Sequence, residues 1–179
     1  MDGSGTAEIH QKQLDMELIR FDRLRETLEA YGEEVRNLYQ DNLITHDRIA
    51  SGGLLNSVAF EVTGNGQRWE VTLSLASYWK YVEYDTKPHW PPLDKILEWI
   101  RIKPVIPRPD KNGKIPTPNQ LSFLIGRKIS RVGTKGSEDL QDALDAVNAK
   151  YREKIVYAIA EDGQTLYRML NIRGELEAK

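Results

Sequence analysis

The sequence predicts an α+β fold, in which a small antiparallel β-hairpin packs against a long N-terminal helix and several further helices. Three observations predict it: one long apolar stripe with helical spacing, one pair of segments with period-two alternation, and helical spacing again after residue 91. The chain has 179 residues, of which 40% are hydrophobic and 29% charged, as in soluble globular domains. We expect one domain over residues 14–172, with flexible tails at 1–13 and 173–179.

The first predicted element is a long amphipathic helix. Apolar residues recur there at steps of three and four: Leu14, Leu18, Phe21, Leu24, Leu28, Tyr31, Val35 and Leu38. Gly32 interrupts good helix formers and costs about 1 kcal/mol relative to alanine. The spacing is compatible with a coiled coil, but we expect the stripe to pack on the rest of the same chain.

The second element is a β-hairpin. Apolar residues occupy alternate positions on both sides of Gly64-Asn65-Gly66, namely Val58, Phe60 and Val62, then Trp69, Val71, Leu73 and Leu75. Such alternation buries one face of the hairpin. Because two strands alone are marginally stable in water, helices or a neighbouring subunit must cover that face.

The middle of the chain is rich in aromatic residues and proline. Residues 78–84 are predicted to form one helical turn that leads into an extended segment. A helix is expected to begin near Pro91-Pro92, with Leu93, Ile96, Leu97 and Ile100 on its apolar face and Pro104 at its end. Residues 103–118 then form an extended proline-rich loop.

Two more helices follow. Thr117, Pro118 and Gln120 predict a capping box with proline at the first helical position, and Gly133 predicts the end of that helix. Its inward-facing residues should be Leu121, Leu124, Ile125, Ile129 and Val132. Ser137 is predicted to cap the last helix, and Asp162-Gly163 to break it before Leu166.

Charge is unevenly distributed along the chain. Nine Lys or Arg and one acid lie between Arg101 and Lys135, which gives this stretch a charge of +8 within a chain of overall charge −2. The remainder therefore carries −10. Such asymmetry is typical of nucleic-acid contact or of charge-complementary self-association, although a solvated basic surface would give the same pattern.

Few residues form a pattern that is typical of a catalytic or metal-binding site. The chain lacks cysteine, its three histidines have no metal-ligand spacing, and it contains no phosphate-binding loop, GxSxG motif or apolar run long enough for a membrane span. The sharpest enzyme hypothesis is a Mg²⁺- or Mn²⁺-dependent nuclease built on Glu83, Asp85 and His89. Another hypothesis is a free DNA-binding accessory protein. Instead, we expect Glu83, Asp85 and His89 to cap turns and to contact other subunits. We expect no enzyme activity, metal or cofactor.

Several motifs occur in a recognisable order. They are the long helix, "SGGLLNS" at 51–57 followed by the hairpin, "YWKYVEYDTKPH" at 78–89, "LDKILEWIRIK" at 93–103 and "SFLIGRKISRVGTKGSEDLQDAL" at 122–144. Over residues 15 to 160 this order resembles the tail-completion and head–tail joining proteins of tailed double-stranded DNA bacteriophages. The sequence departs from the family pattern at Asp85, where glycine is usual, and at residues 136–139.

The resemblance implies a virion structural protein, assembled in the host cytoplasm, that forms a ring in the neck between the DNA-filled head and the tail. The ring would be a hexamer, or twelve-fold if the protein is a connector. Its partners would be other neck, portal-side and tail proteins and the genomic DNA in its channel. Expected subunit-interface residues are Tyr81, Glu83, Tyr84, Asp85 and Thr86. Expected contacts to a partner or to DNA are Lys103, Arg108, Lys111, Lys114, Arg127, Lys128, Arg131 and Lys135.

Overall fold

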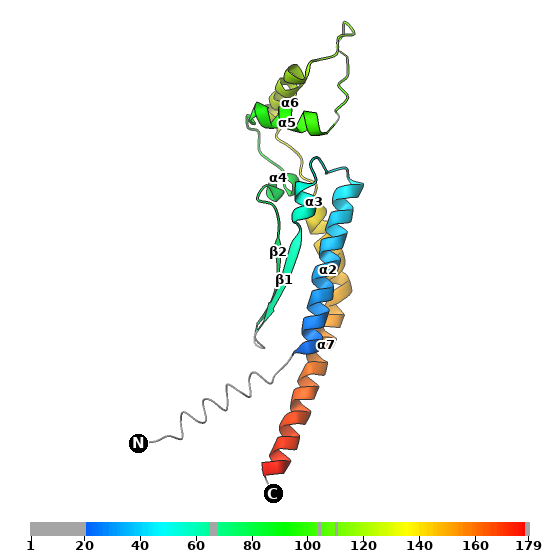
Figure 1. Cartoon of the computed structure of the whole chain (residues 1–179), viewed down its shortest axis with the longest axis vertical. Coiled ribbons are helices and arrows are strands. Elements are labelled where there is room, and N and C mark those ends of the chain that lie inside the picture. Colours follow the sequence, from blue (N-terminus) through cyan, green and yellow to red (C-terminus); the bar gives the residue numbers. More distant parts are fainter. Residues whose placement is uncertain (1–20, 65–67, 104, 110, 178–179) are drawn as a thin grey trace, which may run out of the picture. The chain divides into compact units, whose positions relative to one another are not determined.

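A computed structural model describes residues 21–64, 68–103, 105–109 and 111–177, with side chains up to residue 168. Its described part is α+β, as the sequence predicts: several helices and one two-stranded antiparallel sheet (Figure 1). The predicted tail at 1–13, Leu14 and Leu18 lie outside the described residues. The elements are α2 (Asp22–Thr45), α3 (Gly53–Ser57), β1 (Ala59–Gly64), β2 (Trp69–Ser74), α4 (Trp79–Glu83), α5 (Leu93–Ile102), α6 (Pro118–Val132) and α7 (Asp139–Glu177).

The chain forms two compact units, and the expectation of one domain over residues 14–172 stays a prediction. The first contains residues up to Asn37, the hairpin segment Ala59–Leu73 and residues from Leu144 onward. The second contains Leu38–Val58 and Ser74–Ala143. Each unit joins segments that lie far apart in the sequence, and α2 and α7 contribute residues to both.

In the first unit, the helices cover one face of the hairpin. Leu24, Leu28 and Ala158 form a buried cluster, against which Phe21, Val62, Trp69, Val71 and Ile155 pack. The strands show the predicted alternation of partly buried and exposed residues. Gly32 is explained by this packing, because a Cβ there would lie 2.4 Å from the ring of Phe60. The close approach of the hairpin therefore requires the glycine.

Within this unit, α2 packs along α7 of the same chain, as expected for its apolar stripe. The Tyr31 hydroxyl donates to the side-chain oxygen of Asn148 over 2.9 Å, and the Tyr31 and Tyr151 rings meet edge to face at 5.7 Å. Lys150 forms an ion pair with Glu34. Earlier on α2, Leu24 contacts Asp162, whereas Tyr31 further along α2 contacts Tyr151, so α2 and α7 are antiparallel.

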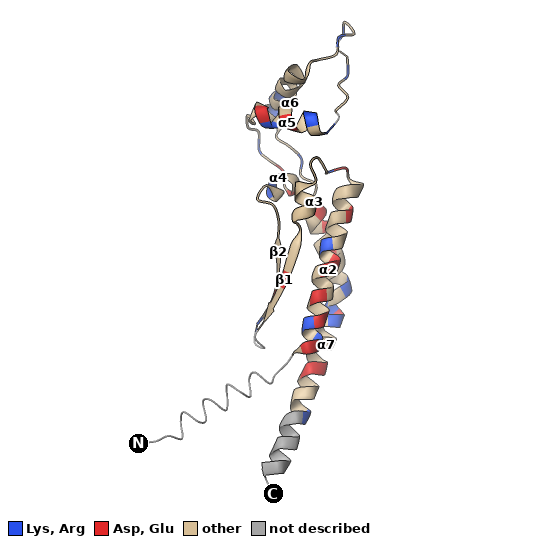
Figure 2. Cartoon of the chain, in the orientation of Figure 1, with Lys and Arg blue, Asp and Glu red and all other residues tan. Residues whose placement is uncertain are grey.

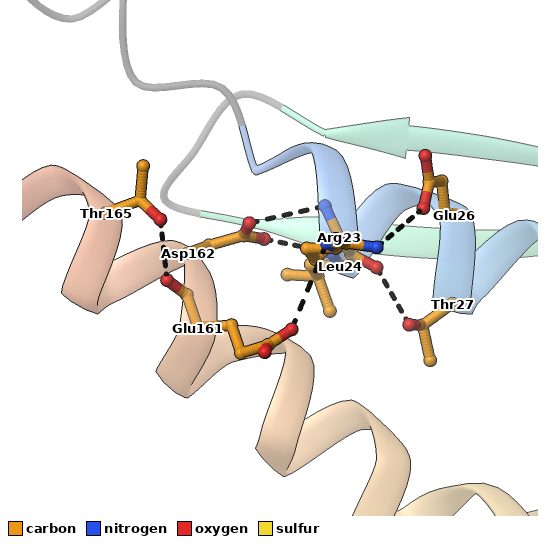
Figure 3. A network of polar contacts seen from close by, with 7 residues as sticks. All are labelled: Arg23, Leu24, Glu26, Thr27, Glu161, Asp162 and Thr165. Carbon is orange, nitrogen blue, oxygen red and sulfur yellow. Dashed lines mark hydrogen bonds and ion pairs between the residues drawn. The ribbon is translucent and has the colours of Figure 1, made fainter.

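The predicted helix break at Asp162-Gly163 is wrong, because α7 is continuous from Asp139 to Glu177. The Asp162 carboxylate instead accepts the backbone N–H groups of Arg23, over 3.3 Å, and Leu24, over 2.9 Å (Figure 3). These N–H groups belong to the first turn of α2, where no preceding carbonyl of the helix can accept them. A carboxylate on α7 therefore caps α2. At its other end, α7 continues past residue 172, the predicted end of the domain.

In the second unit, α6 begins as predicted. Thr117 and Gln120 form a reciprocal capping box, with Pro118 at the first position and Gly133 at the C-cap. The prediction that Leu124 and Val132 face inward is wrong, since they are 41% and 66% exposed. The buried residues of α6 are the small ones, Ser122 and Gly126, because α5 packs closely there. A Cβ at Gly126 would lie 2.6 Å from a methyl group of Leu93.

The proline-rich segment lies between α5 and α6. Pro92 is the N-cap of α5, which ends at Ile102, near the predicted boundaries. Residues 105–109 and 111–117, the parts of this segment that the structure describes, contain neither helix nor strand. Ile106 and Ile115 in this segment are both exposed.

Candidate functional site

The segment that contains α4 docks against the start of α7 in the second unit. The Glu83 side chain is 1% exposed, and its carboxylate accepts the backbone N–H groups of Leu140, over 3.0 Å, and Gln141, over 2.9 Å. The predicted capping role of Ser137 is therefore wrong. Among the described residues the Ser137 hydroxyl has no hydrogen-bond partner. A carboxylate also interacts with the positive end of the helix dipole, which a hydroxyl does not.

Asp85 and Gly136 contact each other, and both are positions at which the sequence departs from the pattern that it resembles. The Asp85 carboxylate accepts the backbone N–H of Gly136 over 2.8 Å. Thr86 and Thr134 pair through their backbones, and their hydroxyl oxygens lie 2.8 Å apart. A Cβ at Gly136 would lie 2.2 Å from the carbonyl oxygen of Glu83, so this close docking requires a residue without a side chain.

The structure separates the five residues expected at a subunit interface into two groups. Glu83 is buried within the chain, and Asp85 and Thr86 have hydrogen-bond partners within it. Tyr81 and Tyr84 are 71% and 52% exposed. An interface role for the five stays a prediction, and the two tyrosines are the members best placed to touch a neighbour.

Glu83, Asp85 and His89 do not form the metal site that the nuclease hypothesis requires. His89 Nδ1 lies 2.8 Å from the Lys87 carbonyl oxygen, and the carboxylates of Glu83 and Asp85 bind backbone N–H groups. Across the described residues, no group of three His, Asp or Glu side chains is arranged to hold a metal ion.

A polar cluster at the start of α7 was not predicted from the sequence. His46 Nδ1 lies 2.5 Å from a carboxylate oxygen of the fully buried Asp139. Tyr39 is also fully buried, and burial, together with the nearby charges of Glu83 and Asp139, raises the pKa of its phenol. His46 and Asp139 are 93 positions apart, so no local sequence pattern connects them.

Four of the recognised motifs line one groove in the second unit. Its volume is about 850 Å³, and its walls come from residues 48–55, 78–89, 92–102 and 129–134, together with Leu43. We call it the aromatic groove after Tyr78, Tyr81 and Trp99, which line it and are all exposed. Ile102 adds an exposed aliphatic side chain. Exposed apolar surface of this kind is typical of sites that bind another molecule.

The expected basic contact residues lie in the second unit in different settings. Lys103 forms an ion pair with Asp47 at 2.8 Å. Arg108 and Lys114 line a shallow cleft beside Phe123 and Leu124. The other five side chains are exposed: Lys111, Arg127, Lys128, Arg131 and Lys135. By contrast, Figure 2 shows cations and carboxylates interspersed along α2 and α7.

No family model, curated protein or solved structure matches this chain. None of the helices that the structure describes is long and apolar enough to cross a membrane. The motifs, the aromatic groove and the arrangement of charge are therefore the features that bear on function.

Proposed function

We propose that the chain is a structural protein of the bacteriophage neck, in the form of a tail-completion or connector subunit. Its ring joins the DNA-filled head to the tail and surrounds the DNA channel. The observation that carries the proposal is that four motifs in the neck-protein order line one exposed apolar groove. Motifs that are far apart in the sequence and share one surface fit a common role in binding.

The aromatic groove suits a contact between unlike surfaces. A closed ring is built from heterologous contacts, in which one face of each subunit meets a different face of the next. Tyr78, Tyr81 and Trp99 supply the large aromatic side chains that are enriched in protein interfaces. Tyr81 is the most exposed of the three and is our choice for the residue that anchors the neighbour.

This role requires no catalytic centre and no cofactor from the chain. The chain's partners would be further copies of itself, the proteins above and below the ring, and genomic DNA. Its place would be the neck of the virion, after assembly in the host cytoplasm.

The test is complementation of a phage that lacks the gene, with Tyr81→Asp as the variant. A carboxylate in the groove should prevent burial against a neighbour, so we expect DNA-filled heads and separate tails in electron micrographs. The matched control is Tyr167→Asp, which changes a similarly exposed tyrosine on α7. Normal yields of joined particles from Tyr81→Asp, with both variants equally folded by circular dichroism, would reject the proposed interface.

A further inference from the structure

One face of α6 carries a row of cations. Arg127, Lys128 and Arg131 are exposed and are spaced by one, three and four positions, so they share one side of the helix. The opposite side contains Ser122 and Gly126, which pack toward α5. The cations therefore point away from the packed interior of the helix pair.

The proline-rich loop extends this row. Arg108 and Lys114 line a cleft of about 700 Å³ together with Phe123 and Leu124, which lie one turn before the α6 cations. Five basic side chains thus lie along one side of α6. We call this surface the basic face, defined by Arg108, Lys114, Arg127, Lys128 and Arg131.

The basic face differs from the other charged surfaces of the chain. Several cations on the other helices pair with carboxylates, as in Arg25–Glu29, Lys95–Glu98 and Lys150–Glu34. Within the described residues, no carboxylate lies within 4.0 Å of the charged groups of Arg127, Lys128 or Arg131. Neighbouring like charges on a helix repel one another, so an external polyanion would be attracted here.

We propose that the basic face binds the phosphate backbone of double-stranded DNA. From Gln120 to Arg131 the helix rises by about 17 Å, which is the rise of about five base pairs carrying about ten phosphates. Five cations along that length match one side of a duplex. The inference rests on the proposed function for the identity of the polyanion, and it adds which surface of the ring subunit meets the DNA.

The test is fluorescence anisotropy of a labelled duplex of arbitrary sequence, titrated with the full chain between about 0.05 and 0.2 M salt. We expect a Kd between about 10⁻⁶ and 10⁻⁴ M near physiological salt, with strong salt dependence. In the triple variant R127Q/K128Q/R131Q, loss of three phosphate contacts should reduce the slope of log K against log salt by about 2.7 and weaken binding at least about tenfold.

Two further variants separate charge from folding. R152Q/K154Q/R168Q removes three exposed cations from α7, and we expect its slope to match that of the unsubstituted chain. R127K/K128R/R131K keeps the charge on α6 and should keep the affinity. Equal weakening by the α6 and α7 glutamine variants, or a wild-type Kd weaker than about 10⁻³ M, would overturn the inference.

Two comparison ligands distinguish other partners. Binding of polyglutamate at concentrations where the duplex does not bind would overturn DNA as the ligand and indicate an acidic protein. Much tighter binding of a single strand than of the duplex would overturn the choice of duplex. The result of the DNA-binding experiment is independent of the Tyr81→Asp test. DNA binding can fail while head–tail joining still depends on the aromatic groove.

Discussion

Glu83 caps the last helix of the chain, with one carboxylate oxygen 2.9 Å from the backbone nitrogen of Gln141, 58 residues away. This contact fixes α4 against the start of α7. The carbonyl groups of Val82 and Glu83 also accept the backbone N–H groups of Ser137 and Glu138. The segment that carries the exposed tyrosines of the aromatic groove is therefore anchored by its buried neighbour.

Replacement of Glu83 tests this anchor. We expect Glu83→Ala to lower the free energy of unfolding by about 2–3 kcal/mol, because it leaves two N–H groups without their acceptor. Glu83→Gln should lower it by about 1 kcal/mol, since an acceptor remains while the charge is lost. Urea unfolding measures both, with exposed Glu61→Gln on β1 as the control. An effect of Glu83→Ala below about 0.5 kcal/mol would contradict the capping role.

Asp162 should be needed for the first turn of α2. Phe21 precedes that helix and has no side-chain acceptor, so the cap comes from α7. We expect Asp162→Ala to cost about 1–2 kcal/mol and to speed hydrogen exchange at the amides of Arg23 and Leu24. Glu153→Ala, on the exposed side of α7, is the control. Unchanged exchange at both amides would show that Asp162 does not cap α2.

Gly163→Ala should stabilise the chain. A Cβ at Gly163 would have no heavy atom within 4 Å, and the residue lies inside a continuous helix. Alanine favours a helix interior by about 1 kcal/mol relative to glycine. We expect the urea midpoint to rise accordingly. A fall in stability would contradict this expectation.

Tyr39 should make stability sensitive to high pH. Burial, and then the charges of Glu83 and Asp139, raise the pKa of its phenol above the ordinary value of 10.0. A raised pKa in the folded state favours the neutral phenol, so its contribution is complete below about pH 10 and is lost above it by up to about 1.4 kcal/mol per pH unit. Tyr39→Phe should flatten the fall in unfolding free energy above pH 10. A profile unchanged from that of the unsubstituted chain would contradict this effect.

Local patterns predicted local structure well. The capping box of Thr117 and Gln120 depends on residues three positions apart, and the hairpin depends on alternation within each strand. The order of elements and the α+β class followed from such patterns. The apolar stripe of α2 also indicated correctly that this helix packs within its own chain.

Two of the failed predictions share one physical cause. A carboxylate from a distant segment can accept the free backbone N–H groups at the start of a helix. Its own local sequence can predict a turn, and the residues next to that helix can predict another cap. Asp162-Gly163 has the residue types of a turn, but Asp162 binds the start of α2 from within α7. Ser137 has the residue type of a cap, but Glu83 takes that role. The aromatic groove likewise combines four segments, and no single one of them predicts it.

Cryo-electron microscopy of the assembled virion tests the central claim most directly. From the proposed function we expect a ring of this chain in the neck between head and tail, with the aromatic groove of each subunit covered by its neighbour. Virions that join heads to tails normally and contain no density for this chain in the neck would rule out the proposed function.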